Sequence, residues 1–262
     1  MSEIKLALAG KVFSLKFKNI RSFFPFIRQH RAFLTEEKPD FFLNFYSRAA
    51  NSHLFSVSLR QKGNQKIIGI KNPEQLQQSF RTRHLEVAVE QPIGLENYLR
   101  VFFSQYLFRR GGGFLLHAST IGHQHKAYIF TGSSGVGKST IARISKGKLI
   151  LTDDLVAIRR LNNGYHAFAM PFGVQSRGLG NLHLPLAAIY LISHAKKTTC
   201  YKIPSVQAAL KVISNIVLIG AQVSPLLIDS LLGNCYDLLK RVPCYGLPFN
   251  KNEDIWRHIK IA

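Results

Sequence analysis

The feature that most constrains this chain is residues 132–139, which match the pattern G-x-x-x-x-G-K-[ST] in full. Glycines let the backbone turn tightly, so that several N–H groups converge on phosphate oxygens. A lysine at the seventh position reaches the β- and γ-phosphates of ATP, and the next hydroxyl ligates Mg²⁺. The pattern therefore predicts a phosphate-binding loop for ATP and Mg²⁺, formed by Gly132, Ser133, Ser134, Gly135, Val136, Gly137, Lys138 and Ser139 and completed by Thr140.

The residues on either side of this loop agree with that interpretation. A phosphate-binding loop follows a strand and opens a helix. Residues 126–131 (KAYIFT) are short and largely apolar, which is typical of a buried strand, and residues 139–144 (STIARI) are compatible with a helix. The alternative is a glycine-rich turn with a chance lysine, which the agreement of pattern and flanks disfavours.

Two adjacent carboxylates follow the next predicted strand, residues 148–152. Asp153 and Asp154 are two of only six acidic residues after residue 110. Carboxylates near a phosphate loop suit base catalysis and metal binding. Because neighbouring side chains on a strand point to opposite faces, we expect one to accept a proton and the other to hold Mg²⁺ or its waters. The alternative is a polar pair that caps the following turn.

The charge of the chain indicates anionic partners. Lys and Arg number 35 against 14 Asp and Glu, for a net charge of +21, and the excess is spread along the whole chain. A positive field attracts ATP, acidic peptides, nucleic acid or anionic lipid. Nucleic acid is disfavoured as a partner because no helix-turn-helix, zinc-finger or RNP-type pattern is present. A basic surface that only keeps the protein soluble is the default alternative.

Cysteine usage and hydropathy predict a cytoplasmic protein. Cys200, Cys235 and Cys244 form no C-x-x-C pair, which argues against a disulfide framework and structural zinc. The N-terminal residues lack the apolar core of a signal peptide. The most apolar window, residues 206–223, is interrupted by polar side chains and is predicted to pack inside the protein.

The pattern of elements predicts an α/β protein with two parts. Residues 1–110 read as an α+β lobe with strands at 41–48, 55–60, 66–71 and 85–89, ending in a helix whose apolar stripe runs from Leu95 to Leu107. Gly111 to Gly113 stop this helix and mark the predicted boundary. Residues 111–262 form the nucleotide-binding core, with helices starting at Ser205 and Pro225, a strand at 244–247 stopped by Pro248, and a helix at 253–259.

The order of motifs resembles the HPr kinase/phosphorylase superfamily, whose P-loop core is related to that of PEP carboxykinase. The segments are LLHAS, the phosphate loop, a strand ending in Asp-Asp, and the RGLG of residues 177–180. The chain is most similar to the short HPr-kinase-like proteins of peptide-modification gene clusters. The resemblance covers about residues 112–262.

The resemblance implies roles for individual residues. Asp153 matches the family's general base, Asp154 its neighbour near the metal, and Arg177 the arginine of the signature. His117 matches the histidine that precedes the phosphate loop. Gln175 stands where the family has a carboxylate, and an amide ligates Mg²⁺ more weakly because it carries no charge.

The resemblance therefore implies a kinase that uses ATP and Mg²⁺ to phosphorylate a serine, threonine or terminal hydroxyl of a peptide, protein or small molecule. The expected catalytic residues are Asp153, Lys138, His117 and Arg177, and the expected metal ligands are Ser139 and Asp154. HPr is not predicted as the substrate, because the segment that recognises it is not recognisable. The alternative is an ATP-sensing module that binds an anionic peptide or nucleic acid without phosphoryl transfer.

Overall fold

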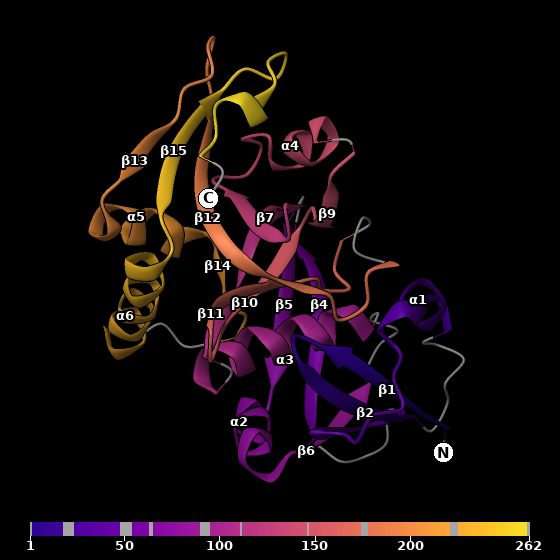
Figure 1. Cartoon of the computed structure of the whole chain (residues 1–262). Helices are drawn as coiled ribbons and strands as arrows, with labels where there is room; N and C mark the ends of the chain where they lie inside the picture. Colours follow the sequence, from indigo (N-terminus) through magenta and orange to yellow (C-terminus); the bar gives the residue numbers. More distant parts are fainter. Residues whose placement is uncertain are drawn as a thin grey trace.

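The protein is described by a computed structural model that covers residues 2–17, 24–47, 54–62, 65–89, 95–110, 112–145, 147–173, 178–220 and 225–260. Two β-sheets make up most of it, with helix α3 between them and helix α2 at the lower left in the view of Figure 1. The N-terminal half forms the lower sheet in that view and the C-terminal half the upper one.

The first sheet has six strands in the order β1-β2-β3-β6-β4-β5. Its two outer hairpins are antiparallel, whereas the inner pairs β2–β3, β3–β6 and β6–β4 are parallel. The strands are β1 (Ser2–Leu8), β2 (Lys11–Phe17), β3 (Phe41–Ser47), β4 (Phe55–Lys62), β5 (Gln65–Lys71) and β6 (His84–Val89), and the helices of this half are α1 (Phe24–Gln29), α2 (Pro73–Thr82) and α3 (Leu95–Arg109).

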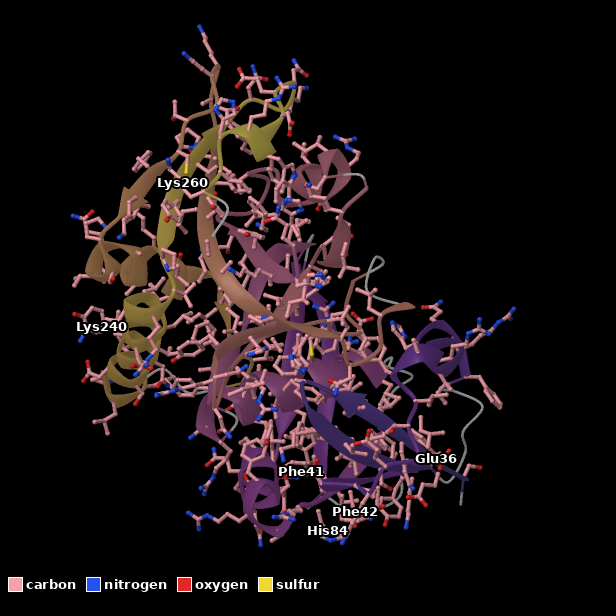
Figure 2. The ribbon with its side chains drawn as sticks, viewed as in Figure 1. Glu36, Phe41, Phe42, His84, Lys240 and Lys260 are labelled. Carbon is pink, nitrogen blue, oxygen red and sulfur yellow. The ribbon has the colours of Figure 1, made fainter. Side chains whose placement is uncertain are left out.

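Alternation along β3 shows why this sheet has one buried face. Phe41 is 6% exposed and packs against Phe13 and Phe102, whereas Phe42 stacks on His84 of the neighbouring strand with ring centroids 4.8 Å apart. Figure 2 shows Phe42 and His84 together at the lower edge of the molecule. Successive side chains of a strand point to opposite faces, so the sheet keeps one apolar face for α3.

The second sheet has nine strands, seven of them in the order β11-β10-β7-β8-β12-β15-β13. The long strand β7 is its organising element, because β14 and β9 pair with it beside the main path. Strands β8, β12 and β15 are parallel to one another. The strands are β7 (Gly113–His123), β8 (Lys126–Thr131), β9 (Leu149–Thr152), β10 (Leu155–Leu161), β11 (Gly164–Phe168), β12 (His183–His194), β13 (Tyr201–Ile203), β14 (Ile216–Val217) and β15 (Cys244–Phe249), and the helices are α4 (Lys138–Ile144), α5 (Ser205–Val212) and α6 (Pro225–Arg241).

One hydrophobic core joins the two halves. The buried stripe of α3 packs against the first sheet on one side and against Leu115, Leu155 and Phe168 of the second sheet on the other. Its Phe102 and Phe103 are 1% and 0% exposed. Burying a phenylalanine side chain stabilises the fold by about 1.5–3 kcal/mol, so α3 contributes to both halves. The predicted division at residues 110 and 111 stays a prediction, but the core itself does not divide there.

Several expectations differ from the structure. Helix α2 is absent from the sequence-based expectations. Its apolar pattern is short, because Leu76 and Phe80 are the two apolar side chains that it buries. Pro248 does not stop β15, which continues to Phe249. Proline is tolerated there because the ladder with β13 ends at Gly246, and the carbonyl of Pro248 accepts from the amide of Thr199. The helix expected at 253–259 is a 3₁₀ turn, Ile255–Arg257, capped by Asp254.

The apolar window at 206–223 is only partly internal. Val206 and Leu210 of α5 are each 61% exposed, whereas Ala208, Ala209 and Val212 are buried. An amphipathic helix buries one stripe and leaves the other face in solvent. No helix in the described part of the chain is long and apolar enough to cross a membrane.

Candidate active site

The glycine-rich loop that is predicted to bind phosphate connects the end of β8 to the start of α4, so the strand and helix expected on either side of it are both present. Its three glycines all have positive φ, +155° at Gly132, +77° at Gly135 and +102° at Gly137. A Cβ on Gly137 would lie 2.8 Å from Cζ of Phe249, at the end of β15. Only glycine adopts this backbone without strain and leaves room for the packed ring.

Lys138 is held inside the loop that precedes it. Its Nζ donates to the carbonyl oxygens of Gly132 and Ser133, each at 2.9 Å, and the residue is only 6% exposed. Burial lowers the pKa of Lys138, and the nearby Asp154 opposes that shift. The ammonium is therefore held by the backbone of the loop, and it interacts electrostatically with Asp154.

A pocket of about 310 Å³ opens over this loop. The volume lies at the lower end of the range of about 300–1,000 Å³ that is usual for small-molecule sites. Ser139 is exposed, so its hydroxyl is accessible from the pocket. The lining residues are His117, Ser134, Gly135, Gly137, Lys138, Ser139 and Thr140.

Strand pairing brings the aspartates to the same edge of the sheet as the loop. Strands β8 and β9 pair with opposite sides of β7, and both run antiparallel to it. Their carboxyl ends, Thr131 and Thr152, therefore lie on one edge, where His117 of β7 also lies. Carboxyl ends of parallel strands are where α/β proteins place their ligands.

Hydrogen bonds fasten these segments to one another. Thr131 Oγ1 donates to the carbonyl of His117 at 2.8 Å, and Ser119 Oγ donates to the carbonyl of Lys138 at 2.7 Å. The amide of Ala118 donates to the carbonyl of Asp154 at 2.9 Å. Ser119 and Thr131 are both fully buried, so these bonds are shielded from water and hold β7, the loop and the aspartate turn in register.

Asp154 is the centre of a charged cluster. Nη2 of Arg100 donates to its Oδ2 at 2.7 Å, and Nε2 of His117 lies 3.7 Å from its Oδ1. Arg100 also donates to the carbonyl of Phe172 and lies over that ring, 4.9 Å from its centroid. Burial alone would lower the pKa of Arg100, but Asp154 and Glu96 outweigh it and raise the pKa. Asp154 is thus an oriented, charge-balanced carboxylate.

The surroundings of His117 favour its neutral imidazole form. Burial lowers its pKa first and the charge of Lys138 lowers it further, while Asp154 acts in the opposite direction. The charges of Lys138 and Asp154 therefore act on its pKa in opposite directions, and its side chain lines the pocket. A neutral imidazole in that place can donate or accept a single hydrogen bond.

Asp153 has different surroundings, although both aspartates lie in the bend between β9 and β10 and not on the strand that the alternation argument assumed. Its Oδ1 is buried and has no hydrogen-bond partner among the described residues. A Cβ on Gly173 would lie 2.3 Å from this oxygen, so a glycine is needed at that position. A buried carboxylate oxygen without a partner is costly, which indicates that a cation or a hydroxyl group is its natural partner.

Comparison with known proteins identifies the family. The model of the family described as "SynChlorMet cassette protein ScmC" matches residues 95–261, well over half of the chain. The chain belongs to this family. The match begins at the first residue of α3, so the ScmC-family region includes the helix that carries Arg100.

Other comparisons add little to that assignment. The chain is similar to the solved structure of the Hpr(Ser) kinase/phosphatase from Coxiella burnetii at 16% identity, with a TM-score of 0.27, over 48% of this chain and 92% of that one. A comparison with curated proteins found no match. The broader relationship of this ScmC-family chain to HPr kinases stays a prediction.

Most of the site residues expected in this ScmC-family chain come together. Gly135, Gly137, Lys138, Ser139 and His117 line one pocket, with the Asp154 cluster beside it. Two expected positions, Gln175 and Arg177, lie outside the described residues. The metal prediction for Ser139 and Asp154 is not tested, and no group of three or more His, Cys, Asp or Glu suited to a metal occurs in the described ranges.

Sequence reasoning missed Arg100. The apolar stripe of α3 predicts that this helix packs in the core, but it predicts no role for the polar face. The available signal was an arginine four residues after Glu96, which places both on one helix face. Nothing in the local sequence reveals that the same face points to Asp154, 54 residues later.

Proposed function

We propose that this protein is an ATP-dependent kinase that transfers the γ-phosphoryl group of ATP to a hydroxyl of a peptide, protein or small molecule. The observation that carries the proposal is the loop of positive-φ glycines and buried Lys138, which shares its pocket with His117 and adjoins the Asp153–Asp154 turn. A binding loop alone would not need the unpartnered carboxylate oxygen of Asp153.

The residues divide the work as follows. Backbone amides of the loop hold the phosphates, and Lys138 offsets charge that develops on the transferring group. Asp153 accepts the proton of the acceptor hydroxyl. The oxygen of that hydroxyl attacks the γ-phosphorus of ATP while the bond between the γ-phosphorus and the bridging oxygen of the β-phosphate breaks, which leaves ADP. His117 hydrogen-bonds at the pocket wall, and Arg177 adds a positive charge. Mg²⁺, when bound through Ser139 and one aspartate, would neutralise phosphate oxygens.

The residues present fit this pair of cofactors. The exposed hydroxyl of Ser139 and the carboxylate of Asp154 are hard oxygen donors of the kind that Mg²⁺ prefers. Asp154 keeps Oδ1 available for water or metal because Arg100 occupies its Oδ2. The acceptor is proposed to be a serine, threonine or terminal hydroxyl, and the protein to act in the cytoplasm.

Incubation with γ-labelled ATP and candidate hydroxyl acceptors tests this function. We expect Asp153→Asn to keep ATP affinity within about threefold and to lower transfer by about 10²–10⁴-fold, since a general base contributes that much. Lys138→Ala is the matched loop variant and should weaken both binding and transfer. Transfer by Asp153→Asn at the wild-type rate would contradict the base assignment.

A second candidate is an ATP-sensing module that binds an anionic peptide or nucleic acid without phosphoryl transfer. Two features favour it: the amide of Gln175 stands where the resembled family has a carboxylate, and Arg100 already neutralises Asp154. ATP would then order the loop and change the affinity for the partner. Equal and strong ATP binding in wild type and Asp153→Asn, with no labelled product from any acceptor, would support this function over the kinase.

A further inference from the structure

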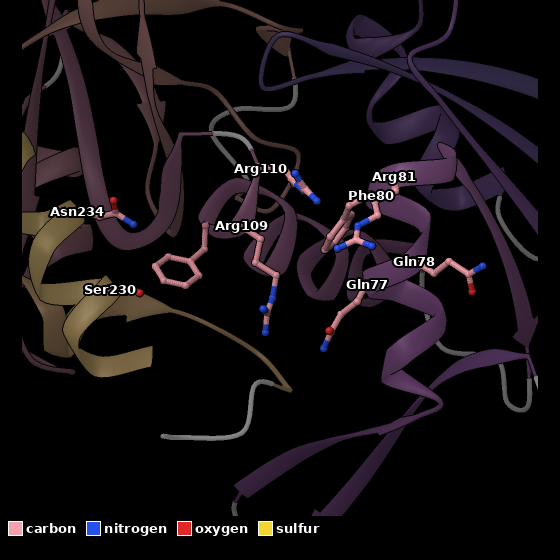
Figure 3. A pocket seen from close by; sticks show the side chains of 9 residues that line it. Gln77, Gln78, Phe80, Arg81, Arg109, Arg110, Ser230 and Asn234 are labelled. Carbon is pink, nitrogen blue, oxygen red and sulfur yellow. The ribbon is translucent and has the colours of Figure 1, made fainter. Parts of the chain in front are cut away.

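A cleft separate from the phosphate loop lies among three helices. It has a volume of about 590 Å³, nearly twice that of the phosphate-loop pocket. Figure 3 shows α2 and the end of α3 on one side and α6 on the other. The lining residues are Gln77, Gln78, Phe80, Arg81, Phe108, Arg109, Arg110, Ser230 and Asn234.

The cleft has a strongly positive lining. Arg81 comes from the last turn of α2, Arg109 from the last turn of α3, and Arg110 follows directly. No carboxylate lines the cleft, and no described carboxylate forms an ion pair with any of these three arginines. Like charges in one concave site repel each other, so the arrangement is relieved by an anion.

The arginine at the centre is positioned by a buried network. Nε of Arg109 donates to Oε1 of Gln105 at 3.1 Å, and Nε2 of Gln105 donates to the carbonyl of Ile219 at 2.7 Å. Gln105 is 4% exposed, and the amide of Ile219 donates to the fully buried Ser104 at 3.1 Å. The network fixes Arg109 against α3 and joins α3 to Ile219.

The remaining polar groups are the side-chain amides of Gln77, Gln78 and Asn234 and the hydroxyl of Ser230. Gln77 points into the space beside Arg109 in Figure 3, and Asn234 faces it from α6, whereas Gln78 points away. A side-chain amide both donates and accepts hydrogen bonds, which matches the N–H and C=O of a peptide backbone. A phosphate group in these places could use only the donors.

We propose that this cleft binds an acidic peptide segment, with its carboxylates on Arg81, Arg109 and Arg110 and its backbone on Gln77 and Asn234. Guanidinium groups bind carboxylates with paired, charge-assisted hydrogen bonds. Single-stranded nucleic acid fits less well, because its binding sites use a row of exposed stacking rings, whereas the rings that line this cleft are Phe80, only 9% exposed, and the partly buried Phe108.

The inference goes beyond the proposed kinase function and does not depend on it. The cleft shares no lining residue with the phosphate-loop pocket. Peptide binding is therefore expected without ATP and in variants that cannot hold ATP.

Fluorescence anisotropy with a fluorescein-labelled Gly-Glu-Ser-Glu-Gly-Glu peptide tests the inference on the full chain at about 0.1 M salt, where distant surface charges are largely screened. The test variant is the triple change Arg81→Gln, Arg109→Gln and Arg110→Gln. The matched control removes three exposed charges elsewhere, in Lys202→Gln, Lys251→Gln and Arg257→Gln. Arg109→Lys keeps the charge but not the planar fork, and circular dichroism verifies that each variant is folded.

We expect the cleft variant to bind at least about tenfold more weakly, the surface control to change by less than about threefold, and Arg109→Lys to fall between them. A peptide with Gln in place of Glu should bind more weakly than the acidic one, and Lys138→Ala should bind like wild type. The inference is wrong if both triple variants lose affinity equally, if the Gln peptide binds as well as the Glu peptide, or if an oligothymidine displaces the peptide and itself depends on the three arginines.

Discussion

At the scale of single residues, the site depends on how a few charges are balanced. Lys138, His117, Asp154 and Arg100 form one electrostatic group: the other three all shift the pKa of His117, and Asp154 also acts to raise the pKa of Lys138 and of Arg100. Burial lowers the pKa of His117 and of Lys138, and the carboxylate of Asp154 opposes both shifts. The group therefore favours the neutral form of the imidazole, beside the guanidinium of Arg100 and the ammonium of Lys138.

His117 should titrate below its ordinary pKa of 6.5. Because the folded protein binds this proton less readily than the unfolded chain, stability rises with pH and falls as the pH drops through about 6.5 and below. The imidazole signals in a ¹H–¹³C NMR titration measure this pKa, and the spectrum of His117→Asn assigns them. A titration midpoint above 6.5 would show that Asp154, and not burial, dominates the imidazole.

Arg100→Gln should separate the orientation of Asp154 from the binding of ATP. Removing the guanidinium leaves Asp154 without its charged partner and should lower the free energy of unfolding by roughly 1–3 kcal/mol, toward the lower end because Asp154 is a third exposed. Phosphoryl transfer should fall while ATP affinity changes little. Urea unfolding and transfer assays measure both effects, with the exposed Arg257→Gln as the control that should alter neither.

At the scale of elements, the loop between β8 and α4 combines unusual backbone angles with close packing. The ends of β12 and β15 supply His194 and Phe249, which contact the loop at Gly135 and Gly137. The loop is thus supported by two parallel strands that lie far from it in sequence. Its shape depends on these contacts as well as on its own glycines.

Gly137→Ala should test that packing. Its φ of +102° strains any other residue by about 1–2 kcal/mol, and its Cβ would also meet the Phe249 ring at 2.8 Å. Gly147→Ala is the matched control, since φ there is +82° with nothing within 4 Å. We expect both variants to lose stability in thermal unfolding but only Gly137→Ala to lose ATP binding in calorimetry. Unchanged ATP affinity in Gly137→Ala would mean that the loop can move away from Phe249.

At the scale of the whole molecule, α3 connects the two sheets through one core. Its Phe102 lies among Phe13, Phe41 and Phe80 of the N-terminal half, while Leu155 and Phe172 of the other half belong to the same cluster. A hydrogen bond from the Gly10 amide to Asn181 also joins the halves, at 3.0 Å. We therefore expect the chain to unfold as one unit.

Phe102→Ala tests whether the two halves unfold together. Emptying this buried position should cost about 3–5 kcal/mol. The single tryptophan, Trp256, lies in the C-terminal half, so its fluorescence follows unfolding far from the mutation. Fluorescence and far-UV circular dichroism should show coincident transitions that both shift to lower urea concentration. A tryptophan transition that stays in place would instead support independent halves that divide near residue 110.

The sequence by itself determined the local features of this protein: a glycine-rich loop between a strand and a helix, the mixed α/β class, and the buried stripe of α3. These follow from spacing and residue type, which act over a few residues. Only the tertiary structure decided that β7 lies between β8 and β9, that Arg100 reaches Asp154, and that three arginines share a cleft with α6. Such contacts join residues far apart in the chain, and they depend on strand order and helix packing, which no local pattern specifies.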